Sequence, residues 1–455
     1  MSIPPIGLSP EAELLPPGPQ STVAHPPNVV RIKAKSNRIG PVLGLALVWT
    51  LFEFGRPPTP PLLLLGISAL LFAWWIAQRK KLDASDAWWF ALIGVTAVGV
   101  VFAENTYSAF MSTRFFVVLF LGICLPFKLL LNTEARARAW MYAFIATAAY
   151  VGIWAITHGG YGPAGSFGHD ENYVAAIVVT GAGLAYFCSL AERRTIVRLL
   201  LLASLVAFVG ALAAANNPSR GGFLALCVVT GYAIYRSPRK MLAISGIVIG
   251  AVALFAFGGD TFWNEISTST DYTSGTGDVR LELWKSGFRM WLANPVIGVG
   301  GGNFIWRIGD FQTAAQFEKF GRELGGSMVA HSMPVELLSE LGLLGVVATT
   351  GLILGAWRGL GRMLLPAARL ERRGVPRDLY VLSCYADALR AALLSILVNG
   401  VFLSLLYYSH LWVFIAASAA LIHVHERCLA RHPAALVPFR GAAVKRSRAS
   451  RGGRR

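Results

Sequence analysis

Charged residues are scarce in this chain, and their scarcity excludes an ordinary soluble protein. Of the 455 residues, 14% are Asp, Glu, Lys or Arg and 55% are hydrophobic. A soluble domain carries about 25% charged residues. Apolar runs of about 20 residues recur along the chain, and each is long enough to cross a bilayer. The sequence therefore predicts an all-α polytopic membrane protein.

Cysteine pairs and cofactor motifs are absent as well. The chain has five cysteines and none forms a CxxC pair, so neither a disulfide framework nor a thiolate metal site is predicted. It contains no DxD, nucleophile elbow, Walker loop or dinucleotide fingerprint. His158, His169 and Asp170 share one loop, which is a weak metal signal. We therefore predict no metal and no cofactor.

The net charge of +17 has a distribution that argues against nucleic acid as a partner. The basic residues lie in short loops between the apolar runs and in the stretch from Lys445 to Arg455. This is the pattern of topology determinants in a membrane protein. The basic C-terminal stretch also suits contact with anionic lipid headgroups. Membrane lipid is therefore the expected partner.

The apolar runs fix the predicted topology. We identify twelve of them, at about 39–55, 60–77, 87–103, 114–131, 138–157, 172–190, 197–215, 220–236, 240–258, 334–357, 387–406 and 409–425. Strongly basic loops alternate with loops poor in Lys and Arg, and the basic set belongs on the cytoplasmic side. We predict a multi-pass protein of a bacterial inner membrane, with both termini cytoplasmic and the less basic loops periplasmic.

One periplasmic loop, residues 259–333, is much longer than the others. It reads as an amphipathic helix from 279 to 293, with apolar residues at 281, 284, 288 and 292, and Asn294-Pro295 ends that helix. The glycines from Gly298 to Gly302 then predict a flexible turn. A loop of this length with its own structure is usually functional. The predicted organisation is a disordered cytoplasmic tail 1–38, transmembrane helices 1–9 over 39–258, the loop 259–333, transmembrane helices 10–12 over 334–425 and a basic cytoplasmic tail 426–455.

Positive charge is unusual in outer loops, and four arginines in or beside the predicted outer loops are therefore candidate site residues: Arg114, Arg220, Arg280 and Arg289. Ser219 is placed to cap the helix that follows it, so Arg220 falls in the first turn. Backbone N–H groups and the helix dipole add to the guanidinium and predict an anion site at the membrane surface. The alternative is an arginine that extends to lipid headgroups.

His331 is the candidate base. It precedes Pro334, which suits the first position of a helix capped by Ser332 or Met333. The helix N-terminus disfavours an imidazolium, and a neutral imidazole can accept a proton from a hydroxyl. Glu336 and Glu340 follow within the apolar helix, where carboxylates are costly and usually functional. The alternative for His331 is a solvated loop histidine without a role.

These residues resemble the superfamily of O-antigen ligases and O-antigen polymerases. His331-Ser332, nine residues and then Gly342-Leu-Leu-Gly345 match one motif of that family, and Arg220-Gly-Gly-Phe-Leu224 matches its R-x3-L motif. The segment from Arg280 to Phe304 is similar to its large periplasmic loop. The sequence also resembles a further element of that family, at Gly165, Phe167, Asp170 and Asn172. The resemblance covers residues 160–350.

The resemblance implies a metal-independent, inverting membrane glycosyltransferase of GT-C architecture with twelve helices. His331, Arg220 and Arg280 would be catalytic. The two arginines would hold the diphosphate of an undecaprenyl-diphosphate-linked glycan and offset the charge of the leaving group. His331 would activate the acceptor hydroxyl. We add Arg114, Arg289, Glu336, Glu340, Asp170 and Asn172 as candidate substrate-binding residues.

Several activities share these motifs. An O-antigen ligase with lipid A–core as acceptor is favoured, and a polymerase that extends a growing glycan is the alternative. A protein O-glycosylation ligase comes next, although the short basic tail disfavours it. A transporter of the same lipid is the alternative from another class. It should place charges near the bilayer midplane, whereas here the arginines and His331 lie at one face.

Overall fold

The structure is a computed structural model that describes residues 40–57, 62–163, 170–215, 218–237, 240–257, 259, 263–264, 275–320, 328–365 and 375–431. The predicted tail 1–38 lies outside the described residues, and so does the predicted C-terminal tail from residue 432 onward. Residues 39–455 form one unit by their contacts. The predicted organisation of the chain is otherwise retained here as a prediction.

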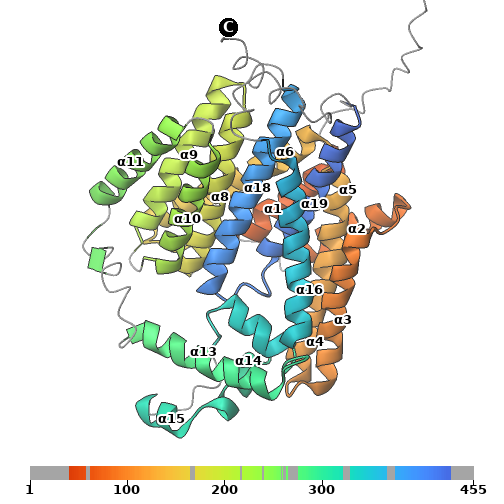
Figure 1. Cartoon of the computed structure of the whole chain (residues 1–455), viewed down its shortest axis with the longest axis vertical. Helices are drawn as coiled ribbons and strands as arrows, with labels where there is room; N and C mark the ends of the chain where they lie inside the picture. Colours follow the sequence, from red (N-terminus) through yellow and green to blue (C-terminus); the bar gives the residue numbers. More distant parts are fainter. Residues whose placement is uncertain are drawn as a thin grey trace, which may run out of the picture. The chain divides into compact units, whose positions relative to one another are not determined.

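The described residues are all-helical and contain no strand, as predicted (Figure 1). In chain order the elements are α1 Pro41–Gly55, α2 Leu63–Ala77, η1 Ala84–Asp86, α3 Ala87–Phe102, α4 Thr106–Leu119, η2 Phe120–Cys124, α5 Leu125–Leu130, α6 Glu134–Thr157, α8 Glu171–Ala191, α9 Thr195–Ala213, α10 Arg220–Arg236, α11 Lys240–Phe257, α13 Gly275–Ala293, α14 Phe304–Arg307, η4 Gly309–Phe311, α15 Ala314–Phe320, α16 Met333–Met363, α18 Arg377–Val401 and α19 Ser409–Leu429.

Seven helices in the described residues are long and apolar enough to cross a membrane. They correspond to seven of the predicted apolar runs, and the other five runs fall on α1, α2, α10, α11 and α19. The count of twelve crossings therefore stays a prediction. One boundary was wrong by about ten residues: α18 begins at Arg377 and ends at Val401, whereas the run was placed at 387–406. The C-terminal helix α19 also extends to Leu429, past the predicted end at 425.

α8 is the central helix of the bundle. It packs against α6, α9, α10 and α18, and nearly all of its side chains are buried. Small residues allow these helices to approach closely. A Cβ at Gly183 would lie 2.9 Å from the Cβ of Ala391 on α18, and one at Gly181 would lie 2.7 Å from the Cβ of Ala148 on α6. α8 is therefore held in place by four neighbouring helices.

The helix ends that carry the predicted outer loops share one end of the bundle, which we call the His331 end. α13, α14 and α15 lie there, below α16 and α18 in the view of Figure 1. Ion pairs stabilise the opposite end. Lys128 Nζ lies 2.6 Å from Asp86, and Arg236 Nε lies 2.9 Å from Asp387. Both carboxylates are buried, so each depends on its cation.

α16 is broken at Gly342, where φ is 59° and ψ is −163°. The segment 295–304, which we call the glycine turn, occupies the break. Leu343 N–H donates to the carbonyl of Pro295 at 2.9 Å, and Leu344 N–H donates to that of Val296 at 3.1 Å. A Cβ at residue 342 would lie 2.5 Å from the Val296 oxygen. The motif glycine therefore supplies both a left-handed backbone and room for another segment.

Glu340 fastens the glycine turn to α16. Its carboxylate accepts hydrogen bonds from the backbone N–H of Gly302 at 2.7 Å and of Phe304 at 2.9 Å. The Tyr407 hydroxyl, from the loop between α18 and α19, donates to the same group at 2.6 Å. The sequence predicted a flexible turn. This prediction was wrong, because backbone and carboxylate hydrogen bonds fix the turn within α16.

Candidate functional site

α13 ends at Ala293 as predicted, but it is turned the opposite way from an ordinary amphipathic helix. Leu281, Phe288 and Leu292, on the predicted apolar face, are 38%, 49% and 58% exposed. The face toward the protein contains apolar Leu283 and Met290, but it also buries polar side chains. The apolar stripe of the sequence therefore identified the helix correctly, but three of its four residues face outward and only Trp284 packs against the buried cluster.

The polar side of α13 is held by Gln316 on α15. The Gln316 amide nitrogen donates to the Glu282 carboxylate at 2.8 Å, and its oxygen accepts from Arg289 at 2.5 Å. Arg289 also donates to Ser286 Oγ and to the carbonyl of Phe311, both at 2.9 Å. These three hydrogen bonds occupy much of the guanidinium. They indicate that Arg289 positions α13, and its predicted contact with substrate stays a prediction.

His331 lies in a strained turn immediately before α16. Its φ is 48°, a left-handed value that is uncommon for a residue with a side chain. Both flanks are fixed: Trp284 Nε1 on α13 donates to the Ala330 carbonyl at 2.9 Å, and Met333 N–H donates to the Leu403 carbonyl at 3.1 Å. Backbone strain that neighbouring contacts enforce is concentrated at functional sites. The predicted start of the helix is also confirmed, with Ser332 as N-cap and Pro334 in the first turn.

Two of the predicted site residues, Arg280 and Asp170, act electrostatically on the imidazole of His331. Burial lowers the pKa of His331 below its ordinary value, the nearby Arg280 guanidinium lowers it further, and Asp170 acts in the opposite direction. Arg280 lies one turn before Trp284 on α13, so both face the His331 turn. A lowered pKa agrees with the predicted neutral imidazole near pH 7. The causes are burial and Arg280, whereas the sequence argument invoked the helix N-terminus.

Arg220 and Asp170 are joined through two helix caps. Ser219 caps α10 by accepting from Gly222 N–H at 3.0 Å, as predicted, and Arg220 is the first residue of that helix. The Ser219 hydroxyl donates to the Asn172 side-chain oxygen at 2.7 Å. The Asn172 amide donates in turn to Asp170, the N-cap of α8, at 2.9 Å. The N-termini of α8 and α10 are therefore adjacent.

This arrangement is suited to an anion. The N-termini of α8, α10 and α16 meet at the His331 end, and each carries a partial positive charge. Arg220 and Arg280 add full positive charges. The charges of Arg280 on α13 and of Asp170 at the N-terminus of α8 both act on the imidazole of His331. Backbone N–H groups and guanidinium groups together are the donors that bind phosphate groups. A neutral imidazole beside them can accept a proton.

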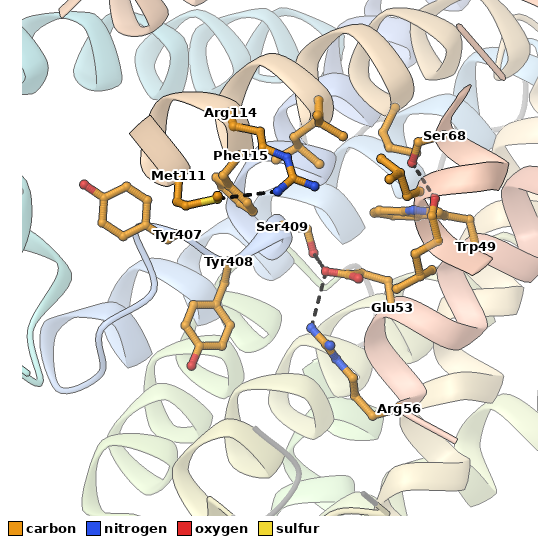
Figure 2. A pocket seen from close by; sticks show the side chains of 15 residues that line it. Trp49, Glu53, Arg56, Ser68, Met111, Arg114, Phe115, Tyr407, Tyr408 and Ser409 are labelled. Carbon is orange, nitrogen blue, oxygen red and sulfur yellow. Dashed lines mark hydrogen bonds and ion pairs between the residues drawn. The ribbon is translucent and has the colours of Figure 1, made fainter. Parts of the chain in front are cut away.

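Arg114 belongs to a different part of the His331 end. It extends from α4 over a cavity lined also by Glu53, Arg56, Tyr407 and Tyr408 (Figure 2). Its guanidinium lies 3.4 Å from the Met111 sulfur. The sequence grouped Arg114 with Arg220 and Arg280, whereas the structure places its guanidinium beside Met111 at this cavity. Its predicted role in substrate binding stays a prediction, and it would concern this cavity.

The two carboxylates of α16 differ in their surroundings. Glu340 accepts three hydrogen bonds from the protein, so its contacts indicate a structural role, and its predicted substrate binding stays a prediction. Glu336 is also buried, and within the described residues its Oε2 has no hydrogen-bond partner. Sugar binding by Glu336 stays a prediction. The distinction depends on partners that lie far away in the chain, and local sequence does not show it.

Metal ligation finds no support in the part of the chain that the structure describes. Within that part, no three His, Cys, Asp or Glu side chains come together as metal ligands. His169, Gly165 and Phe167, which carried the weak metal signal and one resemblance, lie outside the described residues. Metal-independent transfer is therefore a matter for an experiment with a chelator.

Sequence reasoning missed Tyr407 and Arg56. Tyr407 joins Glu340 and the backbone N–H of Gly302, which lies 3.2 Å from its hydroxyl. Arg56 lies in an outer loop, residues 55–59, so the rule that selected the other four arginines applies to it equally. A complete application of that rule would have found Arg56. Nothing in the local sequence around Tyr407 indicates its partners.

Part of the chain matches a known protein family. Residues 203–350 match a family model described as O-Antigen ligase. The chain contains an O-antigen ligase family domain. No curated protein matches the chain. The family domain includes Arg220, Arg280 and His331. Asp170 and Arg114 precede its start at residue 203, and Tyr407 follows its end at residue 350.

The O-antigen ligase family domain confirms the resemblance that the motifs predicted. Together with the apolar helices it identifies a multi-pass membrane protein. It also indicates a glycosyltransferase-like enzyme of the ligase or polymerase type, which acts on polyprenyl-linked glycans and acceptors in general. The domain's boundaries place the break of α16 at Gly342 and the glycine turn within the family's shared part.

Proposed function

We propose that this protein transfers a glycan from undecaprenyl diphosphate to an acceptor hydroxyl, with lipid A–core as the favoured acceptor. In this proposal the His331 end faces the periplasm, both termini are cytoplasmic and the membrane is the bacterial inner membrane. The transfer needs no metal and inverts the anomeric carbon. The distribution of basic loops supports this orientation.

The observation that carries the proposal is the position of His331: its turn is hydrogen-bonded to Trp284 on α13, and the charges of Arg280 and Asp170 both act on its imidazole. It joins a base candidate on α16, an arginine on α13 and the cap of α8, which Asn172 and Ser219 connect to α10. Three segments far apart in the chain thus contribute to one anion-binding centre. A base next to a diphosphate site is what direct glycosyl transfer requires.

The chemistry follows from these positions. Arg220 and Arg280 bind the diphosphate, and they stabilise the negative charge that the leaving undecaprenyl diphosphate gains as its bond to the anomeric carbon breaks. The acceptor hydroxyl attacks that carbon from the opposite side, and the imidazole of His331 takes up the hydroxyl proton. The oxygen–carbon bond forms as the carbon–phosphate oxygen bond breaks, so a single displacement inverts the configuration.

Purified protein in nanodiscs tests the proposal. The donor is an undecaprenyl-diphosphate-linked glycan, supplied with and without lipid A–core in the presence of EDTA, and products are separated by gel and mass. Arg220→Ala, Arg280→Ala and His331→Ala should each reduce transfer at least about 100-fold, since general base and charge-stabilising groups contribute on that order. Arg307→Ala is the matched control, because Arg307 pairs with Glu104 and Asp310 away from the centre.

The products separate the competing activities. Glycan on lipid A–core supports the ligase. Longer glycans on the carrier without lipid A–core would show a polymerase and refute the assigned acceptor. Near-normal transfer by Arg220→Ala or Arg280→Ala would refute the diphosphate site. If no product forms with or without lipid A–core, and the glycan-linked lipid instead moves across the bilayer, the protein is a transporter and not a glycosyltransferase.

A further inference from the structure

A cavity at the His331 end lies between α1, α2, α4 and the start of α19. Its volume is about 370 Å³. Figure 2 shows its polar part, where Glu53 lies between Ser409 and Arg56 and the Arg114 guanidinium extends over the same space from α4. Its other walls are apolar side chains of α2 and α4, among them Leu64, Leu65 and Val118. We call this cavity the lateral slot.

The slot exists because α2 and α4 separate toward the His331 end. α2 packs against η2 and α5, which continue α4 toward the opposite end, and it makes few contacts with α4 itself. The inner closure is tight, since a Cβ at Gly122 would lie 2.8 Å from the Cβ of Ser68. The lining residues on α4 and η2 extend from Met111 to Ile123, a length of roughly 18 Å at 1.5 Å per residue. The slot thus extends along these helices from the level of Met111 to that of Ile123.

The polar residues gather at one end of the slot. Arg56 lies 3.6 Å from Glu53, whose carboxylate also accepts from Ser409 Oγ at 2.6 Å. Arg114 is exposed and contributes a second positive charge, so two guanidinium groups face one carboxylate. The deeper part, around Val118 and Ile123, carries no charge. A charged mouth above an apolar channel matches an amphipathic anion.

Tyr407 and Tyr408 separate the slot from the His331 centre. Both line the slot, and Tyr407 also bonds to Glu340. The Tyr408 ring packs against the ring of Tyr173 on α8, with 5.4 Å between the centroids, close to the Asp170 cap. The segment between α18 and α19 is therefore a thin wall with the slot on one side and the Asp170 cap on the other. A molecule bound by its anionic group in the slot has its headgroup next to this wall.

We propose that the lateral slot binds a phosphate-bearing lipid, with the phosphate between Arg56 and Arg114 and one acyl chain along Leu65 and Val118. The lipid enters from the bilayer leaflet at the His331 end. Resting on the proposed function, this lipid is the acceptor, and its sugar reaches past the tyrosine wall to His331. The donor diphosphate and the acceptor phosphate then occupy separate arginine pairs.

Native mass spectrometry of delipidated protein in detergent tests the binding. The added probes are diphosphoryl lipid A, phosphatidylcholine and inorganic phosphate. Lipid A should bind at least about tenfold more tightly than phosphatidylcholine, because its phosphate monoesters carry a net negative charge, whereas the phosphate of phosphatidylcholine is balanced by its own choline cation. Arg114→Gln should abolish that preference, and Arg307→Gln should retain it. Binding of inorganic phosphate alone, or equal binding of both lipids, would overturn the proposal.

A steric variant tests the apolar part. Leu65 lines the slot and is 41% exposed, so Leu65→Trp fills the channel without disturbing the core. Leu70→Trp is the matched control, since Leu70 is 57% exposed on the same helix and does not line the slot. Leu65→Trp should weaken lipid A binding about tenfold and Leu70→Trp should not. Equal effects of the two would contradict a chain-binding channel.

Kinetics separate this inference from the proposed function. Arg114→Gln and Leu65→Trp should raise the KM for lipid A–core about tenfold and leave the KM for the donor and kcat unchanged. An unchanged acceptor KM with normal transfer would refute the slot and leave the enzyme intact. Absence of transfer in the unmodified protein, with lipid A still bound in the slot, would refute the proposed function alone.

Discussion

At the scale of single residues, the backbone of His331 explains why the site depends on its surroundings. A left-handed conformation costs about 1–2 kcal/mol for a residue with a side chain. Trp284 donates a hydrogen bond to the Ala330 carbonyl, and Met333 N–H donates one to the Leu403 carbonyl; these two bonds hold the turn in place. The imidazole is therefore oriented by α13 on one side and by the loop before α19 on the other.

The pH dependence of transfer should report the neighbours of His331. Because burial and Arg280 lower the pKa of His331, the active neutral form persists below its ordinary value of about 6.5, and activity falls only at lower pH. Asp170 raises that pKa, so Asp170→Asn should move the acid limb of the kcat/KM profile to still lower pH. Asparagine retains the ability to cap α8. Measured profiles of both proteins between pH 4 and 8 check this.

Arg280→Lys is the control for that profile. It keeps the positive charge on α13, so the acid limb should stay where it is even if the rate falls. A limb that moves upward in Asp170→Asn, or an acid limb above pH 6.5 in the unmodified protein, would contradict the electrostatic assignment. Either result would remove His331 from the role of base.

At the scale of elements, the break in α16 is the feature on which the site is built. The glycine turn enters the break, Glu340 fastens it, and α13 lies just before it in the chain. A shift of the turn therefore moves α13, which carries Arg280. The second glycine of the motif, Gly345, packs against Leu341, where a Cβ would lie 2.2 Å from the Leu341 Cβ. Both motif glycines serve the break.

Gly342→Ala should destabilise the protein by about 2–5 kcal/mol, the sum of a left-handed backbone and an overpacked contact with Val296. Gly355→Ala on the same helix is the matched control, since nothing lies within 4 Å of its added Cβ. That substitution should be neutral or slightly stabilising, because alanine favours helix. Thermal unfolding in detergent measures both. Equal melting temperatures would show that the turn does not occupy the break.

The elements could be predicted better than their orientations. Apolar periodicity located α13 and its end at Ala293, and the Ser219 cap located α10, because both signals are local. The outward face of α13 could not be predicted in this way. It depends on Gln316, a residue of a different helix that satisfies the buried polar groups. The role of Glu340 likewise depends on Gly302 and Tyr407.

At the scale of the whole molecule, orientation in the bilayer is the property that the structure leaves to experiment. In a variant without its five cysteines, Asp310→Cys and Lys81→Cys place single thiols at exposed positions at opposite ends of the bundle. A membrane-impermeant maleimide added to spheroplasts should label Asp310→Cys. Lys81→Cys should react only after lysis. The reverse pattern would place the catalytic centre in the cytoplasm and contradict the proposed topology.

Membrane insertion and all-helical character follow from composition, because a bilayer admits few alternatives for an apolar chain. Seven spans qualify by length in the described residues, and the remaining predicted runs coincide with helices. The centre at His331 was predictable in its parts, since each lies in a short motif. The tyrosine wall and the lateral slot were not, since they arise where α2, α4 and the start of α19 meet.

The dependence of the glycine turn on α16 has a consequence for biosynthesis. The ribosome makes α13 and the turn before it makes α16, so the hydrogen-bond partners of residues 295–304 do not yet exist when that segment emerges. The segment must wait, exported and unpaired, until the next hydrophobic helix has been inserted and has brought Glu340 beside it. With the proposed topology, synthesis of this protein therefore includes an interval in which residues 295–304 are open to periplasmic proteases and chaperones, and that interval ends only when α16 is inserted.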